Sequence, residues 1–99
     1  MSSSTEPSIQ HEESGHRGSF FLEQDGKRLA ELTYSRANAS LVIIDHTEVG
    51  KELAGQGMGR KLLDAAVQWA RQTHTKVVAT CPFANAQFTK DPSLRDVLA

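Results

Sequence analysis

Apolar and polar residues alternate along the first half of the chain. Residues 18–24 (GSFFLEQ) and 28–34 (RLAELTY) follow a period of two, which is typical of strands with one buried face. Asp25-Gly26 lies between them and is a strong signal for a two-residue hairpin turn. After a second turn, the run LVII at residues 41–44 begins a third strand, and its unbroken apolar character predicts burial on both faces. We therefore expect a three-stranded antiparallel meander.

From Met58 the apolar period changes to 3.6 residues, which predicts an amphipathic helix of about 15 residues. Residues 75–81 (TKVVATC) read as a short buried strand, and Pro82 can open a second helix through residues 83–90. A last helical turn is expected near residues 93–99. One strand–helix–strand crossover favours parallel pairing of the third and fourth strands. The predicted fold is therefore α+β, a mixed α/β arrangement in which the meander is followed by β-α-β-α.

Composition and charge narrow the class of protein. Residues 1–15 are rich in Ser, Glu and Gln, so we expect a disordered tail there and a single domain over residues 16–99. A net charge of −1 gives no attraction to nucleic acid or to an acidic membrane. No secretory signal is recognised, and no apolar run reaches the roughly 20 residues of a membrane-spanning helix. The single cysteine, Cys81, rules out an internal disulfide and fits a reducing, cytoplasmic location.

Three glycines on alternate positions, Gly55, Gly57 and Gly59, lie between the third strand and the first helix. The backbone N–H groups at a helix start lack partners, and side-chain-free residues let an anion approach them. Arg60 and Lys61 add positive charge in a turn where only an anion would offset it. The spacing fits neither the Rossmann nor the Walker motif. A flexible turn without a ligand is the simpler alternative, and we favour an anion site.

The segment from Ala54 to Gly59 resembles the acyl-CoA loop of the GNAT superfamily of N-acetyltransferases, which reads Arg/Gln-x-x-Gly-x-Gly/Ala. Gly57 and Gly59 match the motif glycines, and Ala54 replaces the leading Arg or Gln. A small stand-alone branch of the superfamily carries HTEV before this loop and a CPFA-like sequence after the next strand. This chain has both, at residues 46–49 and 81–84, and its NAQFTK is similar to an Asn-x-x-Ala stretch of larger members.

The resemblance implies a mixed sheet whose two parallel central strands splay apart, with acetyl-CoA as the cosubstrate. Its pantetheine arm would lie in that wedge, its pyrophosphate on the N–H groups of residues 56–60, and its acetyl carbonyl near a backbone N–H of HTEV. The expected cofactor-binding residues are Thr47, Val49, Ala54, Gly55, Gln56, Gly57, Met58, Gly59, Arg60, Lys61 and Asn85.

Three side chains are candidates for the chemistry. Cys81 precedes a proline that can open a helix, and a helix N-terminus lowers the pKa of a thiol. It is either an acyl-accepting nucleophile or a wall of the thioester pocket. His46 and Glu48 share one face of the third strand and are candidate bases, or else ordinary solvent-facing residues. The general-acid tyrosine of larger relatives is replaced by Thr89.

The leading hypothesis is an acetyl-CoA-dependent N-acetyltransferase acting on a primary amine, either a small molecule or a protein lysine or N-terminus. The chain is too short for the N-terminal helices that shape the acceptor site in larger relatives. A CoA-binding module with little or no catalysis is the alternative, favoured by the missing tyrosine and by Ala54. A phosphate- or nucleotide-binding module unrelated to CoA is a third, weaker possibility.

Overall fold

The computed structural model describes residues 9–99. The predicted tail is therefore only partly covered, because residues 1–8 lie outside the described residues. Over residues 9–15 that prediction is wrong: Ile9–Ser14 form strand β1, which pairs with the next strand from Ile9–Leu22 to Ser14–Arg17. The segment is polar and mostly exposed, yet Ile9 packs against the core and the His11 ring stacks on Phe20 at 4.2 Å between centroids. Strand pairing and this stack order a segment that composition alone describes as disordered.

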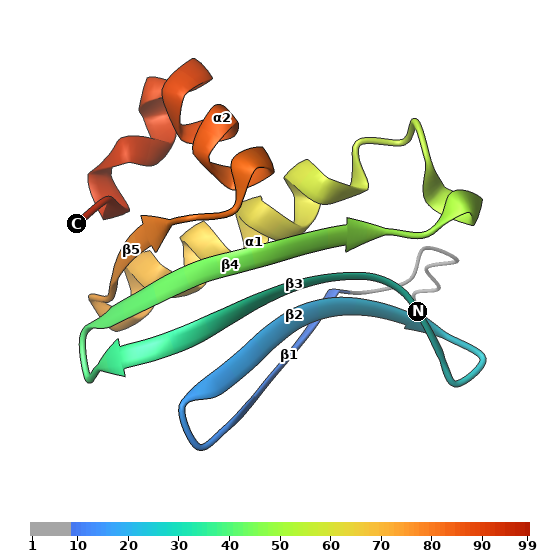
Figure 1. Ribbon diagram of the computed structural model, residues 1–99, viewed down its shortest axis with the longest axis horizontal. Helices are drawn as coiled ribbons and strands as arrows, with labels where there is room; N and C mark the ends of the chain where they lie inside the picture. The colour runs from blue at the N-terminus through green and yellow to red at the C-terminus, as the bar shows by residue number, and fades with distance from the viewer. Residues whose placement is uncertain (1–8) are drawn as a thin grey trace, which may run out of the picture.

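Five strands form one sheet in the order β1-β2-β3-β4-β5 (Figure 1). Strands β2 (Arg17–Gln24), β3 (Lys27–Asn38) and β4 (Leu41–Val49) continue the antiparallel meander from β1, and β5 (Lys76–Ala79) pairs with β4 in parallel. The meander thus has four strands, one more than predicted. The Asp25-Gly26 hairpin is confirmed: both residues have positive φ, at 54° and 75°, as this tight turn requires.

The helices also lie where the pattern predicted them. Helix α1 (Met58–Thr73) packs against β2, β3 and β4, and Figure 1 shows it running behind β4. Helix α2 (Pro82–Lys90) follows β5, and two 3₁₀ helices, η1 (Lys51–Leu53) and η2 (Pro92–Val97), precede α1 and follow α2. The last residues return to β5, where the Ala99 N–H donates to Val77 O at 2.9 Å.

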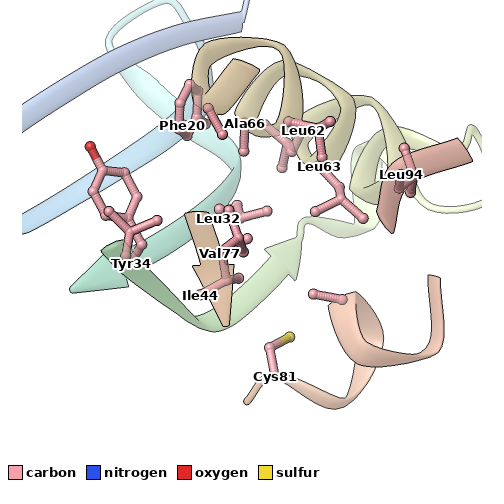
Figure 2. Close-up of a cluster of buried hydrophobic side chains, with 14 of the residues drawn as sticks. Phe20, Leu32, Tyr34, Ile44, Leu62, Leu63, Ala66, Val77, Cys81 and Leu94 are labelled. Carbon is pink, nitrogen blue, oxygen red and sulfur yellow. The ribbon is translucent and has the colours of Figure 1, made fainter. Parts of the chain in front are cut away.

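The core lies between the sheet and α1 (Figure 2). Its least exposed side chains include Leu32, Leu62 and Leu63, each 0% exposed. Val42 and Ile44 face this core, whereas Leu41 and Ile43 on the other face are only half-buried. The predicted burial of β4 on both faces is therefore wrong. We call this second face, turned away from α1, the outer face of the sheet.

Strand β5 is an edge strand, and its pairing with β4 is short. The ladder runs from Leu41–Lys76 to Ile44–Ala79 and stops there. At the same point β4 carries one extra residue, Asp45, opposite β3, which is a β-bulge. The N–H groups of Thr80 and Cys81 both donate to Ile44 O, at 3.0 and 3.2 Å, as the chain turns into α2. The two parallel strands therefore part beyond Ile44.

Candidate active site

Beyond the bulge, some backbone hydrogen-bonding groups of β4 point away from β3. Gly50 directly follows β4, and its N–H donates to Leu29 O of β3 at 2.7 Å. Backbone groups alternate in direction along a strand, so Thr47 and Val49 point away from β3, towards the space that β5 leaves open. A peptide-like ligand in this wedge would find the N–H and C=O of Val49, for which no partner is seen within residues 9–99.

The glycine loop leads into α1 with two residues in the left-handed region. Gly55 and Gly57 have φ of 79° and 70°, which side chains rarely adopt, and Gly57 caps the helix without a side-chain hydrogen bond. The first N–H bonded into the helix is that of Lys61, which donates to Gly57 O at 3.2 Å. Within residues 9–99, the N–H groups of Met58, Gly59 and Arg60 have no hydrogen-bond partner, and the first turn has no acidic residue.

Gly59 serves a different purpose, which its place in the motif did not indicate. A methyl group at this position would lie 3.0 Å from Cζ of Phe83 on α2. The absence of a side chain therefore lets the first turn of α1 and the first turn of α2 approach each other. The two helix starts form opposite walls of one groove.

This groove has a volume of about 390 Å³. It is lined by Thr47, Val49, Leu53, Ala54, Gly55, Gly57, Met58, Gly59, Arg60, Phe83 and Gln87. The structure thus brings together eight of the eleven residues expected to bind the cofactor. Phe83, Gln87 and Leu53 were missed, and only the CPFA match hinted at Phe83.

The other three expected residues lie elsewhere. Gln56 folds back so that its Nε2 donates to Glu52 O at 3.3 Å, and Lys61 is exposed on α1 outside the groove. Asn85 Nδ2 donates to Ala79 O at 3.3 Å and lines a separate hollow beside Arg95. The side chains of Gln56 and Asn85 therefore bind the chain's own backbone in this structure.

Cys81 lies at the meeting point of β4, β5 and α2. It is 4% exposed, caps the N-terminus of α2, and its thiol donates to Thr47 Oγ1 at 3.4 Å. Burial raises the pKa of the thiol, but the side-chain hydrogen bond with Thr47 and the backbone hydrogen bonds with Ala84, Phe83 and Thr47 together outweigh burial. The net effect is a lowered pKa, which favours the reactive thiolate.

His46 and Glu48 share one face, as predicted, but it is the outer face of the sheet. Their side chains are 62% and 73% exposed, with His46 Nε2 at 3.5 Å from Glu48 Oε1. Thr47, between them, points to the opposite side, towards Cys81. The structure therefore separates the two candidate bases from the thiol by the thickness of β4.

The single tyrosine and His11 lie away from the groove. Tyr34 and Cys81 occupy different ends of the core (Figure 2). The Tyr34 hydroxyl donates to Glu13 Oε1 at 2.8 Å and lies 2.6 Å from His11 Nε2, so His11 belongs to a packed cluster and not to a tail or loop. Trp69 of α1 packs on the same cluster. Tyr34 does not line the groove.

A family model described as GCN5-related N-acetyl-transferase matches residues 19–97. The chain is similar to the solution structure of a GCN5-like protein from Staphylococcus aureus, with 35% identity and a TM-score of 0.73 over 97% of this chain and 91% of that chain. A search of curated proteins finds no match. The chain belongs to the GCN5-related N-acetyltransferase family, whose acetyl donor is acetyl-CoA.

Two more distant structures share the fold. A ribosomal-protein-alanine N-acetyltransferase from Brucella melitensis is 15% identical, with a TM-score of 0.60 over 76% of this chain and 62% of that chain. A GNAT acetyltransferase from Elizabethkingia anophelis, solved with acetyl-CoA bound, is 15% identical, with a TM-score of 0.55 over 65% of this chain and 42% of that chain. The predicted mixed sheet with its splayed strands is thereby confirmed. In residues 9–99, no helix has the length and apolar character needed to cross a membrane.

Proposed function

We propose that the groove binds acetyl-CoA and that the protein transfers its acetyl group to a primary amine. The observation that carries this proposal is the groove bordered by unpaired backbone N–H groups, with a buried thiol in contact with one of its lining residues. The N–H groups of residues 58–60 border the groove at the start of α1 and have no partner within residues 9–99. The buried Cys81 does not line the groove, but its thiol contacts Thr47, which does.

The residues present fit such a ligand. A Cβ atom added at Gly55 or Gly57 would meet no heavy atom within 4 Å, so the space around the loop is open and its amides are accessible. We assign the pyrophosphate to the amides from Gly57 to Arg60, and the pantetheine arm to the backbone of Thr47 and Val49. The amide backbone performs the binding, so the replacement of the motif's Arg or Gln by Ala54 removes a single side-chain contact.

In direct transfer, bound acetyl-CoA supplies an activated thioester. The neutral amine would add to the acetyl carbon to form the C–N bond, and the C–S bond would break as the resulting oxyanion collapses. A backbone N–H of residues 46–49 that points away from β3 would stabilise that oxyanion. His46 and Glu48 are exposed on the outer face, where they can accept the proton of the amine directly or through water. Cys81 can return a proton to the departing thiolate.

A Cys81 acyl-enzyme is the competing mechanism. The Cys81 thiolate would form a new C–S bond to the acetyl carbon, CoA would leave as a thiolate, and the amine would then displace Cys81. The lowered pKa of Cys81 supports this route. The distance of His46 from the thiol side of β4 means that Thr47 and the α2 amides, and not a histidine base, activate Cys81.

The surface that the amine acceptor would approach is open. The outer face of the sheet carries His46 and Glu48 in the open, and Val78 of β5 is 36% exposed on this face. We therefore propose an exposed amine as the acceptor, such as a lysine or N-terminus of a protein or a small molecule. We place this reaction in the cytoplasm, with no nucleic-acid or membrane partner.

The second candidate is a module that binds CoA with little catalysis. The specific observation in its favour is that the only tyrosine of the chain, Tyr34, is held in another cluster by Glu13 and His11. Under this function, acetyl-CoA binds and no amine is acetylated.

The test combines calorimetry with intact-protein mass spectrometry, on the wild type and Cys81→Ala with acetyl-CoA. Saturable binding followed by acetylation of amines from a panel is expected. An acetyl adduct that Cys81→Ala loses selects the acyl-enzyme route, and turnover without an adduct selects direct transfer. Binding without turnover selects the CoA-binding module. Absence of binding by the folded wild type would overturn the acetyl-CoA assignment, and displacement by nucleotides would select a nucleotide module.

A further inference from the structure

Arg60 was expected to hold a phosphate, but in this structure each of its three guanidinium nitrogens donates to another side chain. Nε donates to Asp64 Oδ1 at 2.8 Å, Nη1 to Gln87 Oε1 at 3.1 Å, and Nη2 to Asp91 Oδ2. Two of these partners, Gln87 and Asp91, belong to α2 or to the residue that follows it. The side chain therefore joins the first turn of α1 to the far end of α2.

Asp91 is itself held firmly. Its Oδ1 accepts from the Ser93 N–H and hydroxyl at 3.0 and 2.7 Å, which leaves Oδ2 for Arg60. The Ser93 hydroxyl and the Arg60 guanidinium, with the Ser93 N–H, lower the pKa of Asp91 to about 2, so the carboxylate is charged at neutral pH. The ion pair therefore has a fixed anchor on the α2 side.

These contacts close a ring around the groove. Cys81, at the start of α2, contacts Thr47 of β4, and Phe83 lies against Gly59 of α1. Further along α2, Gln87 accepts a hydrogen bond from Arg60, and so does Asp91, the residue after the helix. Since Phe83 and Gln87 both line the groove, the position of α2 sets its width and also the place of the thiol.

We infer that Arg60 is a positioning residue, which clamps α2 against α1 through Gln87 and Asp91 and so holds the groove and Cys81 in their working geometry. This inference rests on the proposed function, because the working geometry is that of acetyl-CoA binding. It differs from the expected role of Arg60 as a phosphate ligand. The guanidinium group of Arg can donate to several acceptors at once, as this clamp requires, whereas the single ammonium charge of Lys suffices to bind a phosphate.

The experiment is a double-mutant cycle of Arg60→Gln and Asp91→Asn, with acetyl-CoA affinity measured by calorimetry. Asparagine can still accept the Ser93 N–H, so Asp91→Asn removes the ion pair and keeps the cap. Each single variant is expected to weaken binding by roughly threefold to tenfold, and the double variant by no more than either single one. Lys61→Gln is the matched control, because it removes the neighbouring positive charge on an exposed side chain.

A phosphate ligand at position 60 gives a different pattern. Arg60→Gln then weakens binding, Asp91→Asn leaves it unchanged or tightens it, and Arg60→Lys restores it. That result would overturn the inference. Under the clamp, Arg60→Lys fails to restore affinity, because one ammonium group cannot span Asp64, Gln87 and Asp91.

A ligand-free readout separates this inference from the proposed function. In the clamp, both single variants speed amide hydrogen exchange in α2 and move the pH profile of Cys81 alkylation upward, because the α2 amides no longer lower its pKa. Unchanged exchange and alkylation in both variants contradict the clamp, even if acetyl-CoA binds. If these readouts change while the wild type binds no acetyl-CoA, the clamp stands and the proposed function fails.

Discussion

The two ends of helix α1 differ in whether the polar groups around them have hydrogen-bond partners. At the N-terminus, glycines expose backbone N–H groups that have no partner among the described residues. Towards the C-terminus, Trp69 packs with the rings of His11, Phe20 and Tyr34, with centroids 5.0, 5.8 and 5.4 Å away. There, the Tyr34 hydroxyl and the Glu13 carboxylate are hydrogen-bonded, and no buried side-chain polar atom of residues 9–99 lacks a partner.

This difference separates a binding end from a structural end. Unpaired amides at a helix start are tolerated because water or a ligand can form hydrogen bonds with them. In the aromatic cluster the Tyr34 hydroxyl and the Glu13 carboxylate already have partners within the protein. Substitutions at the glycine end should therefore change ligand affinity more than stability. Substitutions in the aromatic cluster should do the reverse.

The largest effect is expected at the open end. Gly57→Glu places a negative charge against the pyrophosphate site and should weaken acetyl-CoA binding about a hundredfold or more. The positive φ of Gly57 adds a stability loss of about 1–2 kcal/mol. Calorimetry measures the affinity, and thermal unfolding measures the stability. Gly57→Ala shares the backbone strain without the charge, so its loss of affinity should be much smaller; equal losses would contradict the anion site.

Cys81→Ala tests the buried thiol that contacts Thr47 in the wall of the same groove. Acetyl-CoA affinity should stay within about twofold, while acetyl transfer falls at least about tenfold as the activated thiol is lost. Turnover with an amine panel measures the transfer, and Cys81→Ser keeps the size of the side chain as a control. Undiminished transfer in Cys81→Ala would leave the thiol with a packing role alone.

Tyr34→Phe sharpens the comparison from the aromatic side. It removes the hydroxyl that binds Glu13 and His11, so the free energy of unfolding should fall by about 1–2 kcal/mol. Chemical denaturation measures this loss, and acetyl-CoA affinity should not change. Thr89→Val removes an exposed hydroxyl and should stay within about 0.5 kcal/mol of the wild type. Loss of acetyl-CoA affinity in Tyr34→Phe would contradict the separation of a binding end and a structural end of α1.

The smallest effect is the acid dependence of the aromatic end. The Arg36 hydrogen bond, opposed by burial and helped by Tyr34, lowers the pKa of Glu13 from 4.5 to about 2. A lowered native pKa contributes stability above the unfolded value and loses it as pH falls through the native value. The advantage of the wild type over Glu13→Gln should therefore shrink from pH about 5 to about 2.

Denaturant titrations across that pH range measure the effect. Glu23→Gln serves as the control, because Glu23 is exposed and has no ion pair within the described residues. A constant difference between the wild type and Glu13→Gln would show that Arg36 does not hold the carboxylate charged in solution.

Most elements were predictable because their signals are local. The Asp25-Gly26 turn needs positive φ at two adjacent residues, and the period of α1 follows from the positions of its own side chains. Strand β1 was not predictable in this way. Its polar sequence becomes a strand only through pairing with β2 and through the stack of His11 on Phe20.

Local sequence thus specifies strands β2 to β5, both α-helices, the glycine loop and the family, since each depends on neighbouring residues or on a contiguous motif. The partners of the site residues are a property of the folded chain. Packing turned Arg60 towards Asp91, Asn85 towards Ala79, and His46 to the outer face, away from Cys81. These outcomes depend on how α2 packs beside α1 and on the bulge at Asp45 in the pairing of β3 with β4. Both arise between segments that are distant in the sequence, so no local pattern encodes them.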